Sequence, residues 1–317
     1  MSEVTEKSVT VFDGSMGEEL ADRGFSTRDG LWSAGALLNH PTEVYRLHRD
    51  YLNVGAQIII TNTYSTIPSY LEKAGMGHRV RELTLLATQL ARQALDDVNS
   101  AARTSRLAGC LPPLSESYRP DLVPPVHEAK PIYSELIDCM ASSVDVFLAE
   151  TMSSIDEAMH VAECRAAHKR AVNLPWLVAF TLDDTKEAVL RSGEGIEAAI
   201  RAVARFQPEA ILFNCSTPEA ILSSIAAAAK LKVCKVGGYP NRFNPVPMGW
   251  TLDDEQEITR NVELNVDAFV SWSQRFIAAG AEYVGGCCGI GPRYIEALTT
   301  SLNSAVPDTQ QVVASHN

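Results

Sequence analysis

Short apolar runs recur along the chain, and longer stretches of mixed polarity separate them. We expect strands at Ser8–Asp13, Gln57–Thr61, Arg106–Leu111, Val144–Ala149, Trp176–Thr181, Ala210–Asn214, Lys232–Gly237 and Glu282–Gly286. The apolar residues in these runs are continuous rather than alternating with polar ones. That pattern is typical of strands buried on both faces of a parallel sheet.

The stretches between the runs repeat their apolar residues at helical spacing. They predict helices at Thr42–Val54, His78–Asp97, Ile155–His168, Ile196–Phe206, Pro218–Ala229 and Val266–Ala279. Thr217 followed by Pro218 is typical of a helix start, because proline fits the first helical position. Gly55 and Gly280 are expected to stop two helices just before strands.

Eight strands alternating with helices predict one (β/α)8 barrel over residues 1–303, with 304–317 as a flexible polar tail. The competing interpretation is an open doubly wound sheet, which expects a glycine-rich fingerprint after the first strand. The segment Asp13–Gly17 contains glycines but lacks the GxGxxG spacing. A barrel would bring the carboxyl ends of all its strands to one face.

Two segments are too long and irregular to be simple turns. Pro112–Pro131 is rich in Pro, Ser and Tyr, and Tyr239–Leu252 has three prolines and no hydrophobic period. Both follow predicted strands, so both would lie on the rim of the barrel at its C-terminal face. Long loops in that position usually carry function.

Composition narrows the class of protein. The chain has 317 residues, is 46% hydrophobic and has a formal net charge of 27 − 39 = −12. The apolar fraction excludes a disordered protein, and the acidic balance argues against a nucleic-acid partner. No apolar run reaches the roughly 18 residues that a membrane span needs. The opening residues MSEVTEKS lack the apolar core of a secretory signal, so we expect a cytoplasmic protein.

The chain contains seven cysteines, and an odd number fits a disulfide framework poorly. In a reducing cytosol most of these thiols are expected to be buried apolar side chains. The exception would be a group arranged to bind a metal.

Three cysteines fall at predicted strand ends. Cys215 follows the sixth strand, and Cys287 and Cys288 follow the eighth within a glycine-rich segment that lets the backbone turn. Three thiolates would leave one tetrahedral position of Zn²⁺ open, as in catalytic zinc sites. The alternatives are small buried residues in a tight loop, or a strained disulfide between the adjacent pair.

Seven segments of the chain together resemble the homocysteine S-methyltransferase family. They are FDGSMGEEL, LWSAGALLNHP, VYRLHRDYLNVGAQIIITNTYS, DVFLAETMSSIDEA, FNCSTPEAI, GYPN and GGCCGIGP, in order from Thr10 to Pro292. The resemblance implies a zinc-binding (β/α)8 barrel in which Cys215, Cys287 and Cys288 ligate Zn²⁺. It also implies that the sulfur of homocysteine fills the fourth position.

The implied chemistry is consistent with the residue types. A free thiol has a pKa near 8.5, and zinc coordination removes its proton to give the nucleophilic thiolate. That thiolate would attack the methyl carbon of a sulfonium or ammonium donor. The leaving group departs neutral, so no general acid is needed, and the predicted strand ends contain no histidine.

Two acidic residues end strands over the barrel mouth. The resemblance assigns Glu150, and with it Asp13, to holding homocysteine, since a carboxylate pairs well with the α-ammonium group of the substrate. The alternative for each is that its negative charge caps the following helix.

Further substrate contacts are expected around the same face. Thr61, Asn62 and Tyr64 end the second strand and would line the donor side, and Asn241 lies in the GYPN segment that matches the family. The alternative for Asn241 is an ordinary turn. Trp32 is a candidate aromatic wall, although a buried tryptophan is more often part of the core.

The chain departs from the common family pattern at two places on the rim. It reads GCLPPLSESYRPDL where many members have a GSIGP-like loop, and YPNRFNP where many have YPNSGE. Both changes put the identity of the methyl donor in question, and Tyr118, Arg119 and Asp121 become candidate contacts of the donor or of a substrate carboxylate. We expect S-methylmethionine or S-adenosylmethionine.

Several alternatives stay open at this stage. The same enzyme class would accommodate a betaine-like donor or a selenol acceptor, and a zinc- or thiol-binding barrel without turnover would carry the same ligands. The sequence gives no basis for an oligomeric state.

Other clusters of polar residues are not expected to form sites. His160, Cys164 and His168 share one helix face but span about 12 Å, too far to meet at one ion. The pair Asp183 and Asp184 is typical of a solvated turn or a helix start.

Overall fold

The computed structural model describes residues 9–25, 31–99, 104–251, 254 and 258–304, and its strands form a single parallel sheet. The strands are β1 (Thr10–Val11), β2 (Ile58–Ile60), β3 (Arg106–Leu111), β4 (Val146–Met152), β5 (Trp176–Phe180), β6 (Ala210–Asn214), β7 (Lys235–Tyr239) and β8 (Tyr283–Val284). Their order is β1-β8-β7-β6-β5-β4-β3-β2. A parallel bridge between Phe12 and Ile58 brings β1 beside β2, which confirms the predicted (β/α)8 barrel.

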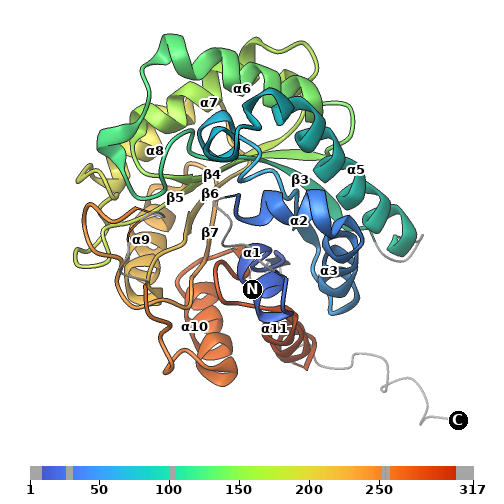
Figure 1. Cartoon of the computed structure of the whole chain (residues 1–317). Helices are drawn as coiled ribbons and strands as arrows, with labels where there is room; N and C mark the ends of the chain where they lie inside the picture. Colours follow the sequence, from blue (N-terminus) through green and yellow to red (C-terminus); the bar gives the residue numbers. More distant parts are fainter. Residues whose placement is uncertain (1–8, 26–30, 100–103, 252–253, 255–257, 305–317) are drawn as a thin grey trace, which may run out of the picture.

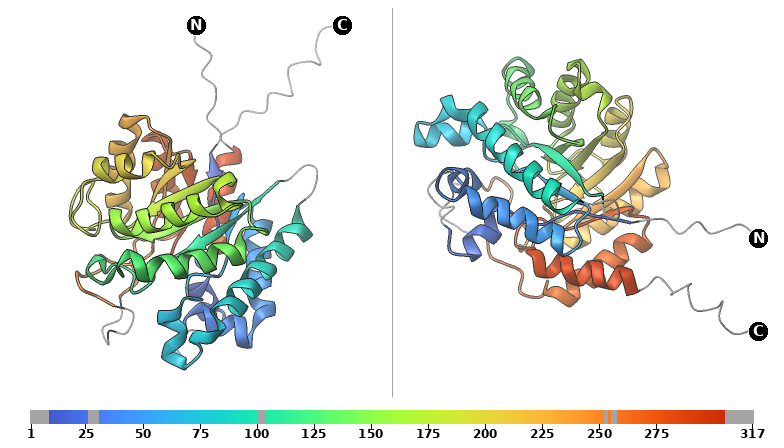
Figure 2. Two further views of the ribbon diagram at one scale, coloured as in Figure 1. Left: turned by 90° about the horizontal axis from the view of Figure 1, so that it is seen from above. Right: turned by 90° about the vertical axis from the view of Figure 1, so that its right-hand side faces the viewer.

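Helices surround the strands (Figures 1 and 2). They are α1 (Gly17–Asp22), α2 (Ser33–Asn39), α3 (Pro41–Asn53), α4 (Pro68–Leu71), α5 (Val80–Val98), α6 (Val126–Met140), α7 (Ile155–Ala167), α8 (Ile196–Ala204), α9 (Pro218–Leu231), α10 (Val266–Ala278) and α11 (Pro292–Ser304). All six predicted helices are present within three residues of their expected bounds. Gly55 and Gly280 have positive φ angles of 105° and 113°, as a helix stop requires.

The core has two layers, which explains the continuous apolar runs. In β4, Val146 and Leu148 point into the barrel interior, whereas Phe147 packs with the residues between the strands and the helices. Successive side chains of a strand point to opposite faces. Both faces are buried here, so every position of the run is apolar.

The structure corrects one predicted boundary on the rim. The irregular segment after β3 ends at Pro125, because α6 begins at Val126 and contains Pro131 within the helix. Helix α6, the short helices α1, α2 and α4, and the last helix α11 were not predicted from the pattern. Helix α11 ends at Ser304, and the rest of the predicted tail lies outside the described residues.

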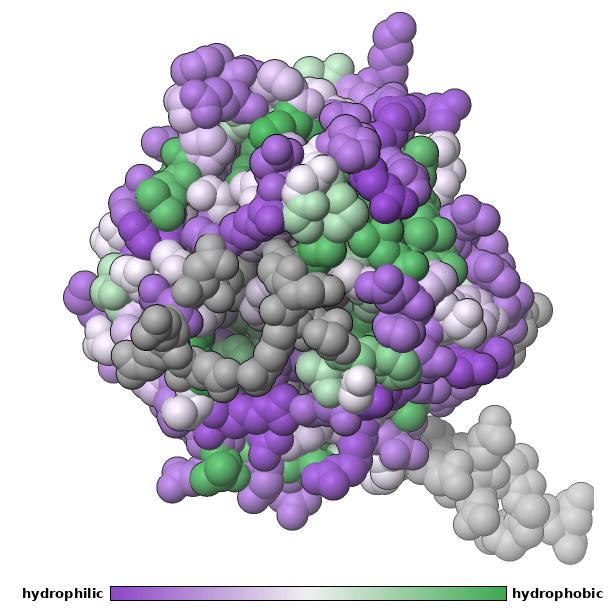
Figure 3. All heavy atoms as spheres, in the orientation of Figure 1, coloured by the Kyte–Doolittle hydropathy of each residue, from purple (hydrophilic) through white to green (hydrophobic). Residues whose placement is uncertain are grey.

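The visible surface is largely hydrophilic, with hydrophobic side chains in small groups (Figure 3). None of the helices in the described ranges is long and apolar enough to cross a membrane.

Candidate metal centre and active site

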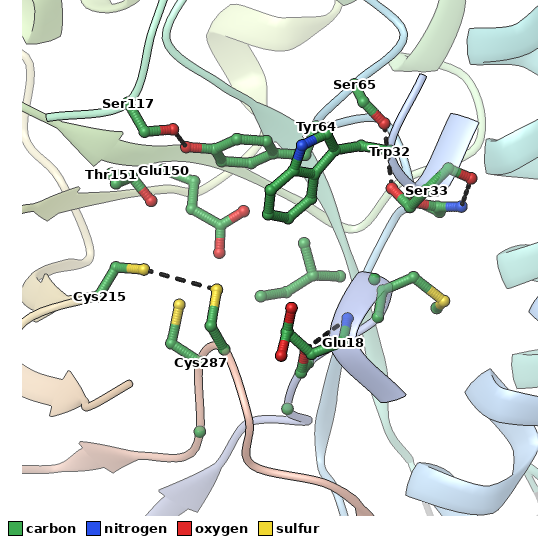
Figure 4. Close-up of a pocket in the computed structure, with 18 of the residues that line it drawn as sticks. Glu18, Trp32, Ser33, Tyr64, Ser65, Ser117, Glu150, Thr151, Cys215 and Cys287 are labelled. Atoms are coloured by element: carbon green, nitrogen blue, oxygen red, sulfur yellow. Dashed lines mark hydrogen bonds between the residues drawn. The ribbon is translucent and has the colours of Figure 1, made fainter. Parts of the chain in front are cut away.

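Three cysteine sulfurs meet at the C-terminal face of the barrel. Cys215 directly follows β6, and Cys287 and Cys288 lie in the loop after β8. The three Sγ atoms lie within 4.8 Å of one another, and those of Cys215 and Cys288 are 3.8 Å apart (Figure 4). The structure therefore brings together the three cysteines that the sequence analysis selected.

The backbone around the cysteines is bent where regular strands would point adjacent side chains apart. Cys215 has a φ angle of 50° and Gly289 one of 75°, so the chain turns sharply after both strands. The loop after β7 fixes the arrangement: Cys287 N–H donates to the Pro240 carbonyl (2.9 Å), and Arg242 N–H donates to the Cys288 carbonyl (2.7 Å).

The sulfur cluster fits a tetrahedral zinc ion. A Zn–S bond of about 2.3 Å and tetrahedral angles place two ligand sulfurs about 3.8 Å apart, and Cys215 and Cys288 have that separation. Hydrogen bonds from the other two thiols lower the pKa of Cys215, so this residue readily supplies the thiolate that a metal needs. In the described parts of the chain, no other group of His, Cys, Asp or Glu side chains could hold a metal.

Two neighbours contact the sulfur of Cys215. The hydroxyl group of Tyr118 lies 2.9 Å from Sγ, and the side-chain amide of Asn241 lies 4.0 Å from it. Asn241 is almost completely buried and does not line the cavity, so its position supports the cysteine cluster rather than direct substrate contact.

Glu150 lies near the cysteines in the barrel interior (Figure 4). Its Oε2 accepts a hydrogen bond from the Cys110 thiol (3.0 Å), and its Oε1 accepts one from the Tyr239 hydroxyl (3.3 Å). Burial raises the pKa of Glu150 to about 7, and the nearby negative charge of Cys215 also raises it.

Asp13 is the second buried carboxylate of the cavity. Its Oδ2 accepts the backbone N–H of Ile60 (2.8 Å), whereas Oδ1 has no hydrogen-bond partner among the described residues. Burial raises the pKa of Asp13 well above its usual value. Neither carboxylate caps a helix: the hydroxyl groups of Ser15 and Ser154 accept the N–H groups at the starts of α1 and α7.

The cavity around these groups takes in most of the predicted substrate contacts. Its lining includes Asp13, Thr61, Asn62, Tyr64, Glu150 and the three cysteines, together with Trp32. The Thr61 hydroxyl is already bonded to Thr63 and the N–H of Cys110, and the Asn62 amide donates to the Ser33 carbonyl. Thr61 and Asn62 therefore form part of the cavity wall, with these hydrogen-bonding groups already paired within the protein.

The cavity lining has a distinct chemical character. Its charged members are all acidic, and its described part has no Lys, Arg or His. Aromatic side chains supply much of the rest: Trp32, Tyr64, Tyr70, Tyr118, Phe243 and Trp250. Such a lining favours a ligand that carries positive charge.

Some candidate residues do not reach the cavity. Arg119 and Asp121 pair with each other at the surface (2.7 Å). His168 accepts the backbone N–H groups of Arg170 and Ala171, in keeping with its place outside any metal site.

The sequence analysis missed three groups that belong to the site. Cys110 and Tyr239 are the partners of Glu150, and Glu18 of α1 lines the cavity. Cys110 lies near the end of the predicted strand Arg106–Leu111, and a strand end can approach the site. Tyr239 is the first residue of the irregular segment Tyr239–Leu252 and carried no signal of its own.

Comparison with known proteins agrees with this geometry. The sequence model of the family described as homocysteine S-methyltransferase matches residues 10–302. The chain belongs to the homocysteine S-methyltransferase family. Its curated relatives include the homocysteine S-methyltransferase of Escherichia coli (strain K12), 27% identical over 92% of this chain and 94% of the relative. Selenocysteine Se-methyltransferase of Brassica oleracea var. italica is also 27% identical, over 93% of this chain and 89% of the relative.

Solved structures of the family share the same barrel. The crystal structure of the homocysteine methyltransferase MmuM from Escherichia coli in its metallated form has a TM-score of 0.78 and 25% sequence identity. The match covers 93% of this chain and 97% of MmuM. Membership in this family makes the chain a methyltransferase.

Proposed function

We propose that the protein transfers a methyl group from a sulfonium donor, S-methylmethionine or S-adenosylmethionine, to the sulfur of homocysteine, giving methionine. The observation that carries the proposal is the cluster of three cysteine sulfurs at a cavity that also contains buried carboxylates. In this proposal the enzyme works in the cytoplasm, within one barrel domain over residues 1–303.

Cys215, Cys287 and Cys288 would hold Zn²⁺. Bound there, the ion would lower the pKa of the homocysteine thiol, which is near 8.5 in free solution, and so supply the thiolate. Tyr118 and Asn241 would orient Cys215 through the contacts described above.

Glu150 and Asp13 would bind the α-ammonium group of homocysteine. Their burial makes an unpaired negative charge costly, and an ammonium group would offset that cost. The unpartnered Oδ1 of Asp13 offers a free acceptor for such a group. The hydrogen bonds from Cys110 and Tyr239 would hold the Glu150 carboxylate in place.

The lining supports a cationic methyl donor. A sulfonium centre is attracted to aromatic faces and to carboxylates, and the described lining offers both without a competing cation. In the reaction, the bond from the homocysteine sulfur to the methyl carbon forms as the bond from that carbon to the donor sulfur breaks. The donor leaves as a neutral thioether, so no side chain has to supply a proton.

A donor panel tests this proposal. Purified protein with homocysteine would be given S-methylmethionine, S-adenosylmethionine or betaine, and methionine would be measured. We expect methionine from at least one sulfonium donor and little from betaine. Its absence with every donor would refute the proposal and favour a zinc- or thiol-binding barrel without turnover.

A selenol acceptor is a second candidate, because a curated relative is named selenocysteine Se-methyltransferase. Replacing homocysteine by selenocysteine in the same panel, and measuring the methylated product of each, would rank the two acceptors.

A further inference from the structure

Two rim loops meet over the cysteines. The first, residues 112–125 after β3, contributes Ser117 and Tyr118 to the cavity, and the second, residues 240–251 after β7, contributes Phe243 and Trp250. The rings of Tyr118 and Trp250 lie 6.0 Å apart, and both pack with the cysteine cluster. These are the loops in which the sequence departs from the common family pattern.

A buried arginine joins the two loops from a third. Arg191 lies in the β5–α8 loop and is only 2% exposed. Its Nη2 donates to the Pro247 carbonyl (2.5 Å) of the second loop, and its Nε donates to the Tyr118 carbonyl (3.4 Å) of the first. Its guanidinium carbon also lies 5.5 Å from the centre of the Tyr118 ring.

Tyr118 needs such support, because its backbone is strained. Its φ angle of 66° lies in the left-handed region, which costs a residue with a side chain about 1–3 kcal/mol and persists only where the surroundings hold it. The contacts with Arg191 hold its carbonyl and its ring, and the contact with Cys215 holds its hydroxyl group.

Asp184 ties the second rim loop to the segment that follows Cys215, whereas a solvated turn was one expectation for it. Its two carboxylate oxygens accept the backbone N–H of Thr217, two residues after Cys215, and that of Val246 in the second loop. Burial lowers the pKa of Arg191, and the negative charge of Asp184 offsets part of that lowering. The hydrogen bonds to the Tyr118 and Pro247 carbonyl groups hold the Arg191 guanidinium group between the two loops.

We propose that Arg191 is a positioning residue that fixes Tyr118 and Trp250 as one wall of the methyl-donor side, and so sets which donors fit. The inference rests on the proposed function. Arg191 makes none of the described contacts of Glu150 or Asp13, so the proposed grip of these carboxylates on homocysteine does not involve it. Its described link to Cys215 runs only through Tyr118, and excess Zn²⁺ in the assay offsets any weaker metal binding.

Replacement of Arg191 by Met tests the inference, with Arg165→Met as the matched control. Arg165 is also a buried arginine that donates to carbonyl groups, those of Val172 and Leu174, and lies 5.5 Å from the ring centre of Trp176, away from the cavity. With Zn²⁺ in excess, we expect R191M to raise the KM for the donor at least tenfold and to change the KM for homocysteine less than twofold. R165M should change neither KM.

Amide hydrogen exchange separates this inference from the proposed function. In R191M, exchange should rise in two segments, residues 114–122 and residues 243–250. In R165M, exchange in these segments should stay unchanged. The measurement needs no donor turnover. Unchanged exchange in R191M would overturn the positioning role. Increased exchange with an unchanged donor KM, or an equal rise in both KM values, would overturn the role in donor selection.

A milder variant covers the case in which R191M does not fold. Arg119→Ala removes the hydrogen bond from Arg119 Nη1 to the Gly249 carbonyl (3.0 Å), a second tie between the same loops, together with the surface ion pair to Asp121 within the first loop. A selective rise of about threefold in donor KM would support the inference, and an unchanged donor KM would contradict it.

Discussion

The hydroxyl group of Tyr118 lies 2.9 Å from the sulfur of Cys215, one of the three cysteines that form the candidate metal centre. A hydrogen bond to that sulfur stabilises its thiolate form and lowers the pKa of Cys215. The rim loop after β3 therefore contacts the candidate metal centre as well as forming part of the cavity wall.

We expect Tyr118→Phe to weaken zinc binding about tenfold, because groups that hydrogen-bond to metal ligands typically contribute that much. Competition with a chromophoric chelator measures the change. Tyr64→Phe is the control, since the Tyr64 hydroxyl bonds to Ser117 in the same cavity and makes no described hydrogen bond to a cysteine. Equal zinc affinity in wild type and Tyr118→Phe would contradict the role of this hydrogen bond.

Replacing Glu150 by Gln should raise the KM for homocysteine roughly ten- to a hundredfold, because a charge-assisted hydrogen bond is worth about 1.5–3 kcal/mol. Steady-state kinetics at saturating donor measures it. Glu157→Gln is the control: Glu157 is equally buried, but it bonds to Ser153 beside α7 rather than lining the cavity. A KM unchanged by Glu150→Gln would rule out the proposed contact.

Glu157 makes stability depend on pH in a specific direction. Burial raises its pKa from 4.5 to about 7, so between these values the folded protein holds a proton that the unfolded chain has released. Its contribution is therefore fully present below about pH 4.5 and is lost as pH rises towards 7.

Denaturant unfolding of wild type and Glu157→Gln would reveal this contribution. From about pH 5 to about pH 8, wild type should lose roughly 2–3 kcal/mol of unfolding free energy relative to the variant. Other groups, including Glu150, titrate in both proteins and cancel in the difference. A difference that stays constant with pH would show that Glu157 is not held in its protonated form.

The barrel and the meeting of cysteines from two distant strand ends were predictable because each depends on a local pattern. A strand with two buried faces has a continuous apolar run, as in Val146–Ala149, and the ends of parallel strands share one face. Cysteines at two such ends, Cys215 and Cys288, can therefore approach each other, and the structure brings their sulfurs to 3.8 Å.

Contacts set by strand register were not predictable. Cys110 pairs with Leu148 across β3 and β4, and this register places its thiol beside Glu150, 40 residues away. Helix α6 was also missed, because Pro131 indicates a break, whereas the helix accommodates it. Arg191 could not be recognised either, since its role depends on two loops that lie far apart in the sequence.

The account depends most on the metal that Cys215, Cys287 and Cys288 are proposed to hold. The direct measurement is methionine formation from homocysteine and a sulfonium donor after removal of the metal by a chelator and after addition of Zn²⁺. We predict that activity disappears with the metal and returns as about one zinc ion per chain is bound. Full activity in the metal-free protein would contradict the central claim.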